Sequence, residues 1–217
     1  MLVNIQSWGE TLRLLVELAG TAAFAVSGVL EAARKKLDAV GVCVVAFLTA
    51  FGGGTLRDLL LDQRPFFWVR HTEFVWGILG LSVAAMLFMR QRHFQPTERA
   101  MLLPDAIGLG LFAAVGVDIA TAVGMPALIA VMMGVTTGVF GGVLRDVLCN
   151  QVPVVFQREL YAMVSLVVCC LFLGLRALEV NESLNTALSF AVGLLLRMLA
   201  IWRCWRLPTF SYQQRWD

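Results

Sequence analysis

Two arginine–aspartate pairs, each placed shortly after a cluster of glycines, stand inside long apolar stretches of this sequence. The first lies in FGGGTLRD at residues 51–58 and the second in FGGVLRD at residues 140–146. Glycine weakens a helix by about 1 kcal/mol relative to alanine, and charged groups within a membrane are costly and usually functional. Interrupted helices at corresponding places in two halves of a chain are typical of transport sites. The two motifs therefore predict a transport pathway.

The glycines predict that the two helices carrying the motifs unwind at mid-membrane. Unwinding frees backbone carbonyls, which is tolerated only against protein or a water-filled cavity. The first half-helix of each pair would end there with a partial negative charge, and two such ends favour a cation, much as carbonyl oxygens do in potassium filters. The carbonyls expected to bind the cation belong to Phe51, Gly52, Val139 and Phe140.

The charged side chains of the motifs need partners. We hypothesise that Arg57 pairs with Asp146 across a pseudo-twofold axis, and that Arg145 pairs with Asp58 in the same way. The alternative carries equal weight: each pair only fastens the two halves together, because buried ion pairs are as often architectural as functional.

Threonines near the glycines add hydroxyl groups to the predicted path, although a threonine hydroxyl often bonds back to a helix carbonyl instead. The predicted ion pathway comprises Thr49, Phe51, Gly52, Gly53, Gly54, Arg57, Asp58, Thr137, Val139, Phe140, Gly141, Gly142, Arg145 and Asp146.

Three further acidic residues lie in or near the apolar stretches. Glu17 and Asp105 occupy equivalent positions in the two halves. We expect Asp105 to be a charge at a helix start in the membrane interface, and Glu17 to lie deeper and face a cavity. Asp118 is expected at an external mouth.

The composition excludes most soluble functions. The chain has 217 residues, of which 59% are hydrophobic and 15% charged, whereas a soluble domain is about half apolar and about a quarter charged. A net charge of +2 is too small to suggest nucleic acid, and the five cysteines lack metal-ligand spacing. The glycine motifs lack the ending of a phosphate loop, and both histidines are expected in loops, where no Ser-His-acid set forms. We therefore expect no enzyme and no cofactor, only potassium or sodium as permeant ions in a lipid bilayer.

The predicted fold class is an all-α polytopic membrane protein that forms a single membrane domain over residues 1–217. Repeat one covers about residues 11–90, repeat two about 103–178, and a seventh helix about 184–205. Helices two and five are expected to be broken at their glycines. The seven expected spans cover about residues 11–33, 39–61, 73–89, 105–123, 126–149, 160–178 and 184–205.

The repeat rests on one constant offset. Arg145 minus Arg57 is 88, and the same offset pairs Gly20 with Gly108 without a gap. A unit of three spans that occurs twice in one chain must enter the membrane from opposite sides, so the halves are inverted copies.

Lys and Arg residues predict the orientation, because they favour the cytoplasmic side. One side carries four, namely Arg13, Arg64, Arg70 and Arg176. The other carries ten, namely Arg34, Lys35, Lys36, Arg90, Arg92, Arg99, Arg158, Arg203, Arg206 and Arg215. The N-terminus is therefore expected outside and the C-terminus in the cytoplasm.

These residues resemble the prokaryotic branch of the TRIC (trimeric intracellular cation channel) family, whose members are also labelled glycine-transporter-domain proteins. The resemblance covers about residues 14–205 and rests on GGxxRD at 53–58 and 141–146 and on DAxGLxxFxxxG at 105–116. It implies a homotrimer in the bacterial inner membrane, with seven helices per subunit and helices two and five kinked at the glycines. Each subunit would hold one pore for monovalent cations, chiefly potassium, lined by the motif residues.

Three functions remain open at this point. The leading one is a passive monovalent cation channel, potassium-permeable, with one pore per protomer. The alternative is a secondary transporter of glycine or another small zwitterion, since inverted repeats with interrupted helices are common in transporters. A purely structural membrane protein is the third.

Overall fold

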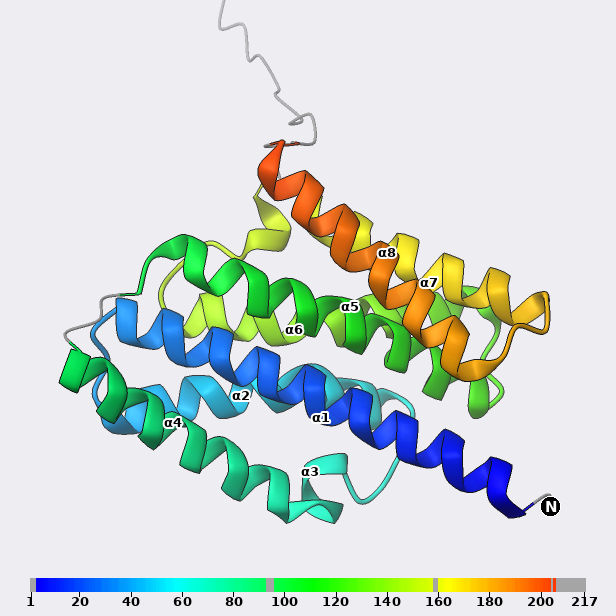
Figure 1. Cartoon of the computed structure of the whole chain (residues 1–217), viewed down its shortest axis with the longest axis horizontal. Helices are drawn as coiled ribbons and strands as arrows, with labels where there is room; N and C mark the ends of the chain where they lie inside the picture. The colour runs from blue at the N-terminus through cyan, green and yellow to red at the C-terminus, as the bar shows by residue number, and fades with distance from the viewer. Residues whose placement is uncertain (1–2, 93–95, 158–159, 204, 206–217) are drawn as a thin grey trace, which may run out of the picture.

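The computed structural model describes residues 3–92, 96–157, 160–203 and 205, and all regular structure within these ranges is helical. The helices are α1 (Val3–Arg34), α2 (Ala39–Leu60), α3 (Phe67–Arg70), α4 (Thr72–Arg92), α5 (Glu98–Ala122), α6 (Ala127–Leu148), the 3-10 turn η1 (Val154–Phe156), α7 (Tyr161–Ala177) and α8 (Glu182–Trp202). Helices α1 and α5 lie side by side, and α2 and α6 lie behind them (Figure 1).

Six of these helices, α1, α2, α4, α5, α6 and α8, are long and apolar enough to cross a membrane. Helix α7 is apolar but has only 17 residues, so the count of seven spans stays a prediction. Arg158, Arg206 and Arg215, which contributed to the predicted orientation, lie outside the described residues.

Helices α1 and α5 begin earlier than expected, α1 at Val3 rather than near residue 11. Helix α5 begins at Glu98, so Pro104 lies inside it rather than before it. The expected start is wrong because residues 98–103 already form helical turns. A proline inside a helix removes one backbone hydrogen bond and crowds the preceding turn, but here the helix continues through it. The short helix α3, between α2 and α4, was not predicted.

The repeat is visible in how α2 and α6 end. Asp62 and Asn150, which are 88 residues apart, adopt left-handed backbone conformations with φ of 51° and 54°. Such residues commonly close a helix, and Asp and Asn tolerate this conformation. The next residues, Gln63 and Gln151, donate their backbone N–H groups to the last helical turn, both at 2.8 Å. Because α2 and α6 end in the same way, each Arg-Asp pair lies in the same place relative to the C-terminal end of its helix.

Helices α1 and α5 pack through reciprocal glycine–phenylalanine contacts. A Cβ atom built on Gly108 would lie 2.7 Å from the ring of Phe24, and one on Gly20 would lie 3.2 Å from the ring of Phe112. The two rings themselves pack at 5.4 Å between centroids. These contacts exchange under the offset of 88, so the two halves (α1, α2, α4 and α5, α6, α7) are related by a pseudo-twofold axis.

Helices α2 and α6 are continuous through their glycines, and the predicted breaks are wrong. The glycines instead allow a close antiparallel crossing. A Cβ on Gly53 would overlap the carbonyl oxygen of Thr137, and a Cβ on Gly141 would overlap the carbonyl oxygen of Thr49. Small residues at such crossings let helix backbones approach closely in membranes. Contact with a facing carbonyl therefore explains these glycines without unwinding.

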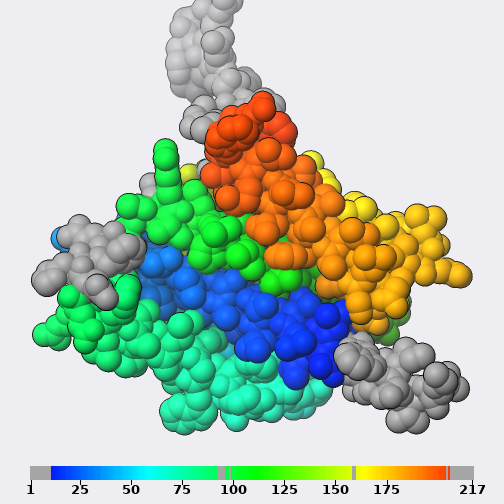
Figure 2. Space-filling view, in the orientation of Figure 1, coloured from blue at the N-terminus to red at the C-terminus, as the bar shows by residue number. Residues whose placement is uncertain are grey.

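Helix α8 lies outside the repeat. It packs on α5 and α7, and in the space-filling view its side chains cover part of α5 (Figure 2). No helix among the described residues takes the equivalent place on α1 and α4. The second half is therefore the more enclosed of the two.

The close crossing predicts the effect of a single methyl group. Gly53→Ala should lower the free energy of unfolding by about 1–3 kcal/mol, the usual cost of overpacking, because its Cβ meets a backbone carbonyl that cannot rotate away. Thermal unfolding in detergent measures the change. Gly80→Ala on α4 is the matched control, since its Cβ would meet no atom within 4 Å. Equal stability of Gly53→Ala and the wild type would contradict the close crossing.

Candidate functional site

Arg57, in the last turn of α2, is the centre of a buried charge cluster in the first repeat. Its Nη2 and Nε atoms contact Asp58 Oδ1 at 2.7 and 2.8 Å, and its Nη1 donates to Glu17 Oε1 on α1 at 3.1 Å. Asp58 Oδ2 accepts the backbone N–H of Phe67 at 3.1 Å. The three charged residues are only 2–5% exposed. A buried guanidinium is tolerated when it is paired in this way.

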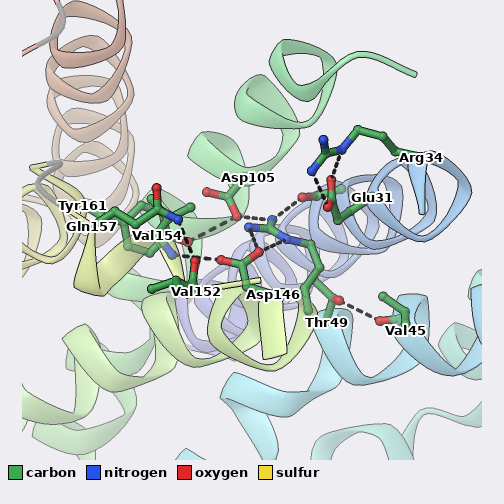
Figure 3. A network of polar contacts seen from close by, with 12 residues as sticks. Glu31, Arg34, Val45, Thr49, Asp105, Asp146, Val152, Val154, Gln157 and Tyr161 are labelled. Atoms are coloured by element: carbon green, nitrogen blue, oxygen red, sulfur yellow. Dashed lines mark hydrogen bonds and ion pairs between the residues drawn. The ribbon is translucent and has the colours of Figure 1, made fainter. Parts of the chain in front are cut away.

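Arg145 is the centre of the equivalent cluster in the second repeat. Its Nη2 and Nε contact Asp146 Oδ1 at 2.8 and 2.9 Å, and its Nη1 donates to Asp105 Oδ1 and to Ser27 Oγ, both at 2.5 Å. Asp146 Oδ2 accepts the backbone N–H of Val154 at 2.9 Å. Figure 3 shows the side chains of Asp105 and Asp146 close together, and both carboxylates form ion pairs with the Arg145 guanidinium. The cluster joins α1, α5 and α6.

The structure contradicts the predicted cross-pairs. Each arginine binds the aspartate that follows it and an acidic residue 40 positions earlier in its own repeat. The reason is the antiparallel crossing of α2 and α6. Arg57 and Arg145 follow the crossing on their own helices, so they lie toward opposite ends of the bundle and neither reaches the other motif's aspartate.

A cavity of about 480 Å³ opens beside the first cluster. Glu17, Arg57 and Asp58 all line it, together with Arg13 and Arg70. The expectation that Glu17 faces a cavity is therefore confirmed.

A second hollow, of about 10 Å³, shares Glu17 and Arg57 with this cavity and reaches Gly54 and Thr55 on α2. That volume corresponds to about one water molecule. The described residues thus form an open cavity and, beside it, a small hollow on α2 next to the glycine crossing.

Asp118 on α5 lies near this cavity but is occupied by two arginines. Arg13 Nη2 donates to its Oδ2 at 2.5 Å, and Arg176 Nη1 donates to its Oδ1 at 3.0 Å. Asp118 is 6% exposed. The three side chains tie α1, α5 and α7 together, with Arg13 at the cavity wall.

The second repeat is filled where the first is hollow. The hydroxyl of Tyr161, on α7, donates to Asp105 Oδ1 at 3.2 Å. A Cβ on Gly142 would lie 2.6 Å from that hydroxyl oxygen. The guanidinium of Arg197, on α8, lies over the tyrosine ring at 4.9 Å from its centroid. Tyr161 and Arg197 are each 1% exposed.

The remaining pathway residues lie at the crossing. Thr49 and Thr137 are fully buried, and their hydroxyls donate back to the carbonyls of Val45 and Met133, each at 2.6 Å. The alternative reading of these threonines therefore holds.

The four residues predicted to bind a cation through their carbonyls, Phe51, Gly52, Val139 and Phe140, stand within continuous helices. The Phe51 carbonyl accepts a hydrogen bond from the Thr55 hydroxyl at 2.8 Å. Their role as ion ligands stays a prediction. Of the predicted set, the structure brings Arg57 and Asp58 to the cavity and buries Arg145 and Asp146 away from it.

Sequence reasoning missed several partners. Asp105 was expected at the interface, but it is 2% exposed and bound to Arg145, because a buried arginine next to one aspartate still needs a second anion. The shared offset of Asp105 and Glu17 was the available signal. The sequence did not indicate the roles of Ser27, Tyr161 and Arg197. The offset of 88 pairs none of them with a residue of similar chemistry.

Comparison with known proteins places this architecture in a family. The family model described as "Glycine transporter" matches residues 14–90 and again 102–177. A UPF0126 membrane protein of Vibrio cholerae is 43% identical over 209 residues, covering 93% of this chain and 84% of the relative. The UPF0126 inner membrane protein YadS of Escherichia coli is 37% identical over 205 residues, covering 92% and 96%.

Solved structures agree with this assignment. The TRIC trimeric intracellular cation channel orthologue from Rhodobacter sphaeroides superposes with a TM-score of 0.82 at 36% identity, covering 89% of this chain and 99% of that one. A structure described as the basis for conductance through TRIC cation channels superposes with a TM-score of 0.81 at 35% identity, covering 92% and 97%. With its two family-model matches, its UPF0126 relatives and these superpositions, the chain belongs to the TRIC family, as its paired glycine motifs predicted.

Proposed function

We propose that this chain forms a passive channel for monovalent cations, with potassium as a permeant ion and one pore in each protomer. The observation that carries the proposal is the cavity of about 480 Å³ that ends on the buried cluster of Glu17, Arg57 and Asp58. Solved relatives at 35–36% identity are described as cation channels, which supports the same conclusion.

The charges of the first cluster favour a cation. Two carboxylates surround one guanidinium, so the cluster has one formal negative charge more than positive. Arg57 fixes the positions of Glu17 and Asp58, while Asp58 is also held by a backbone N–H. Glu17 lines both the cavity and the narrow hollow below it. The excess of carboxylate is local to the cluster, because Arg13 and Arg70 add positive charge elsewhere in the cavity wall, and a local excess of negative charge attracts cations.

The path would continue through the α2–α6 crossing. Gly54 and Thr55 line the narrow hollow, and the predicted residues Gly53, Thr137 and Gly141 lie next beyond them at the crossing. The backbones touch there, so conduction requires a separation of the two helices. In that state the carbonyls of Phe51, Gly52, Val139 and Phe140 would become available as ligands, which is how the predicted cation site enters the mechanism.

The proposed assembly is a homotrimer with seven spans per subunit in the bacterial inner membrane. One solved relative described as trimeric and a relative named an inner membrane protein support this proposal. With the N-terminus outside, the mouth of the cavity, beside Arg13 and Arg70, faces outward.

Reconstitution into planar bilayers tests the function. Under a potassium gradient we expect discrete current steps whose reversal potential lies close to the potassium equilibrium potential. Replacing potassium by sodium on one side of the bilayer then measures the preference of the channel for potassium over sodium. Saturable glycine counterflow in vesicles, without current steps, would contradict the channel and favour the zwitterion transporter.

Glu17→Gln tests the role of the cavity charge. At low salt the potassium conductance should fall by on the order of tenfold, because the neutral amide no longer concentrates cations in the cleft. The reduction should be smaller at high salt, where charges are screened.

Asp62→Asn is the matched control, since it removes the same charge from a side chain that is 94% exposed. An equal loss in both variants would assign the effect to general surface charge. An unchanged conductance in Glu17→Gln would remove Glu17 from the pathway.

A further inference from the structure

Helix α8 packs on the second repeat at a place whose counterpart in the first repeat is left open. On α5, a Cβ atom built on Gly110 would lie 3.2 Å from the ring of Phe190 of α8. Under the offset of 88, Gly110 corresponds to Ala22 on α1, which is partly exposed. Among the described helices, none covers α1 and α4 as α8 covers α5 and α7, and α1 lies open beside α4 in the space-filling view (Figure 2).

A groove of about 360 Å³ occupies this open place between α1 and α4. Its volume lies within the range of small-molecule sites, about 300–1,000 Å³. The lining is apolar apart from Thr21 and Glu73. Leu81 also lines a second apolar hollow of about 140 Å³ between the same two helices, so the apolar surface continues along them. The groove is therefore an elongated apolar site on the outside of the bundle.

Glu73 gives the groove a charge at one end. It stands in the first turn of α4 with its side chain 66% exposed, and its carboxylate contacts His71 Nδ1 at 2.9 Å. With the N-terminus outside, this end lies at the outer membrane surface. Molecules that carry an ammonium group on an apolar body keep the charge at the water boundary and bury the body. A carboxylate above an apolar groove fits that chemistry.

Two contacts link the groove to the narrow hollow of about 10 Å³ beside α2. Thr21 lines both spaces. Phe74 lines the groove, and its ring stacks at 5.2 Å between centroids on Phe67, which lines the hollow. Because the hollow has room for about one water molecule, a small inward displacement of these side chains would fill it.

From these contacts we infer that the groove between α1 and α4 binds an amphiphilic amine from the outer half of the bilayer, and that this binding lowers cation conduction. The ammonium group pairs with Glu73, and the apolar body lies along Gly77 toward Leu81. The occupied groove presses Thr21 and Phe74 toward the hollow. The binding site does not depend on the proposed channel function, whereas the inhibition rests on it.

Octylammonium tests the inference in planar bilayers, with octanol as the uncharged probe. Octylammonium on the outer side should reduce the potassium current of the wild type in a concentration-dependent way. Glu73→Gln should raise its half-inhibitory concentration by about twofold to fivefold, the usual effect of losing an exposed ion pair, and should leave that of octanol unchanged. No inhibition of the wild type, or an equal response of both probes to Glu73→Gln, would overturn the inference.

Gly77→Leu tests the groove itself. A Cβ atom on Gly77 would meet no atom within 4 Å, so the new side chain enters the groove without a clash. The half-inhibitory concentration of octylammonium should rise by about tenfold or more, because the leucine displaces about two methylene groups of the probe, each worth roughly fourfold in affinity.

Gly80→Leu is the matched control for the filled groove. Gly80 has equal space around it but does not line the groove, so this variant should respond to octylammonium like the wild type. Equal sensitivity of Gly77→Leu and the wild type, or an equal loss in Gly80→Leu, would overturn the assignment of the site.

Photolabelling locates the site without a current. A diazirine derivative of octylammonium should label α1 and α4 near Gly77 much more in the wild type than in Gly77→Leu, and excess octylammonium should suppress the labelling. Absence of this labelling, the result expected if a partner subunit or a bound lipid already fills the groove, would overturn the inference. So would suppressible labelling of a conducting channel that is not inhibited. Suppressible labelling of a wild type that carries no current would overturn the proposed function and support the binding site.

Discussion

The direct contact between the backbones of α2 and α6 constrains the rest of this protein. Gly53 touches the carbonyl of Thr137 and Gly141 touches the carbonyl of Thr49, so no side chain separates the helices. The antiparallel crossing sends the C-terminal turns of α2 and α6 in opposite directions. It thereby fixes a charge cluster near each end of the bundle, and it makes the helix–helix contact itself the narrowest part of any path between them.

The two charge clusters show how a membrane-embedded bundle accommodates arginine. Each guanidinium is bound by two carboxylates, one from the next residue and one from the first helix of its own repeat. The arrangement satisfies the buried charge and leaves an excess of carboxylate, which suits cations. Architecture and permeation are therefore not alternatives here, because the same pairs that fasten α1 to α2 also shape the floor of the cavity.

The repeat, most of the helices and the family were predictable, because an offset of 88 and glycine motifs are properties of the sequence itself. The continuity of α2 and α6 was not, because glycine is compatible both with an interrupted helix and with close packing, and only the facing atoms decide between them. The pairing of Arg57 was not predictable either, because it depends on the antiparallel crossing of the two helices. Glu17 was expected at a cavity from its depth, whereas Asp105 was misplaced because its burial depends on Arg145. The burial of Tyr161 against the second cluster could not be predicted, since it depends on contact with α8, which lies outside the repeat.

The glycine crossing is tested most directly by solid-state NMR of the protein in lipid bilayers, with glycine and threonine labelled with carbon-13. Continuous, touching helices predict helical chemical shifts for Gly53 and Gly141. They also predict cross-peaks from the Cα of Gly53 to the carbonyl carbon of Thr137, and from the Cα of Gly141 to that of Thr49. Non-helical shifts at both glycines, with neither cross-peak, would show interrupted and separated helices and would contradict the account.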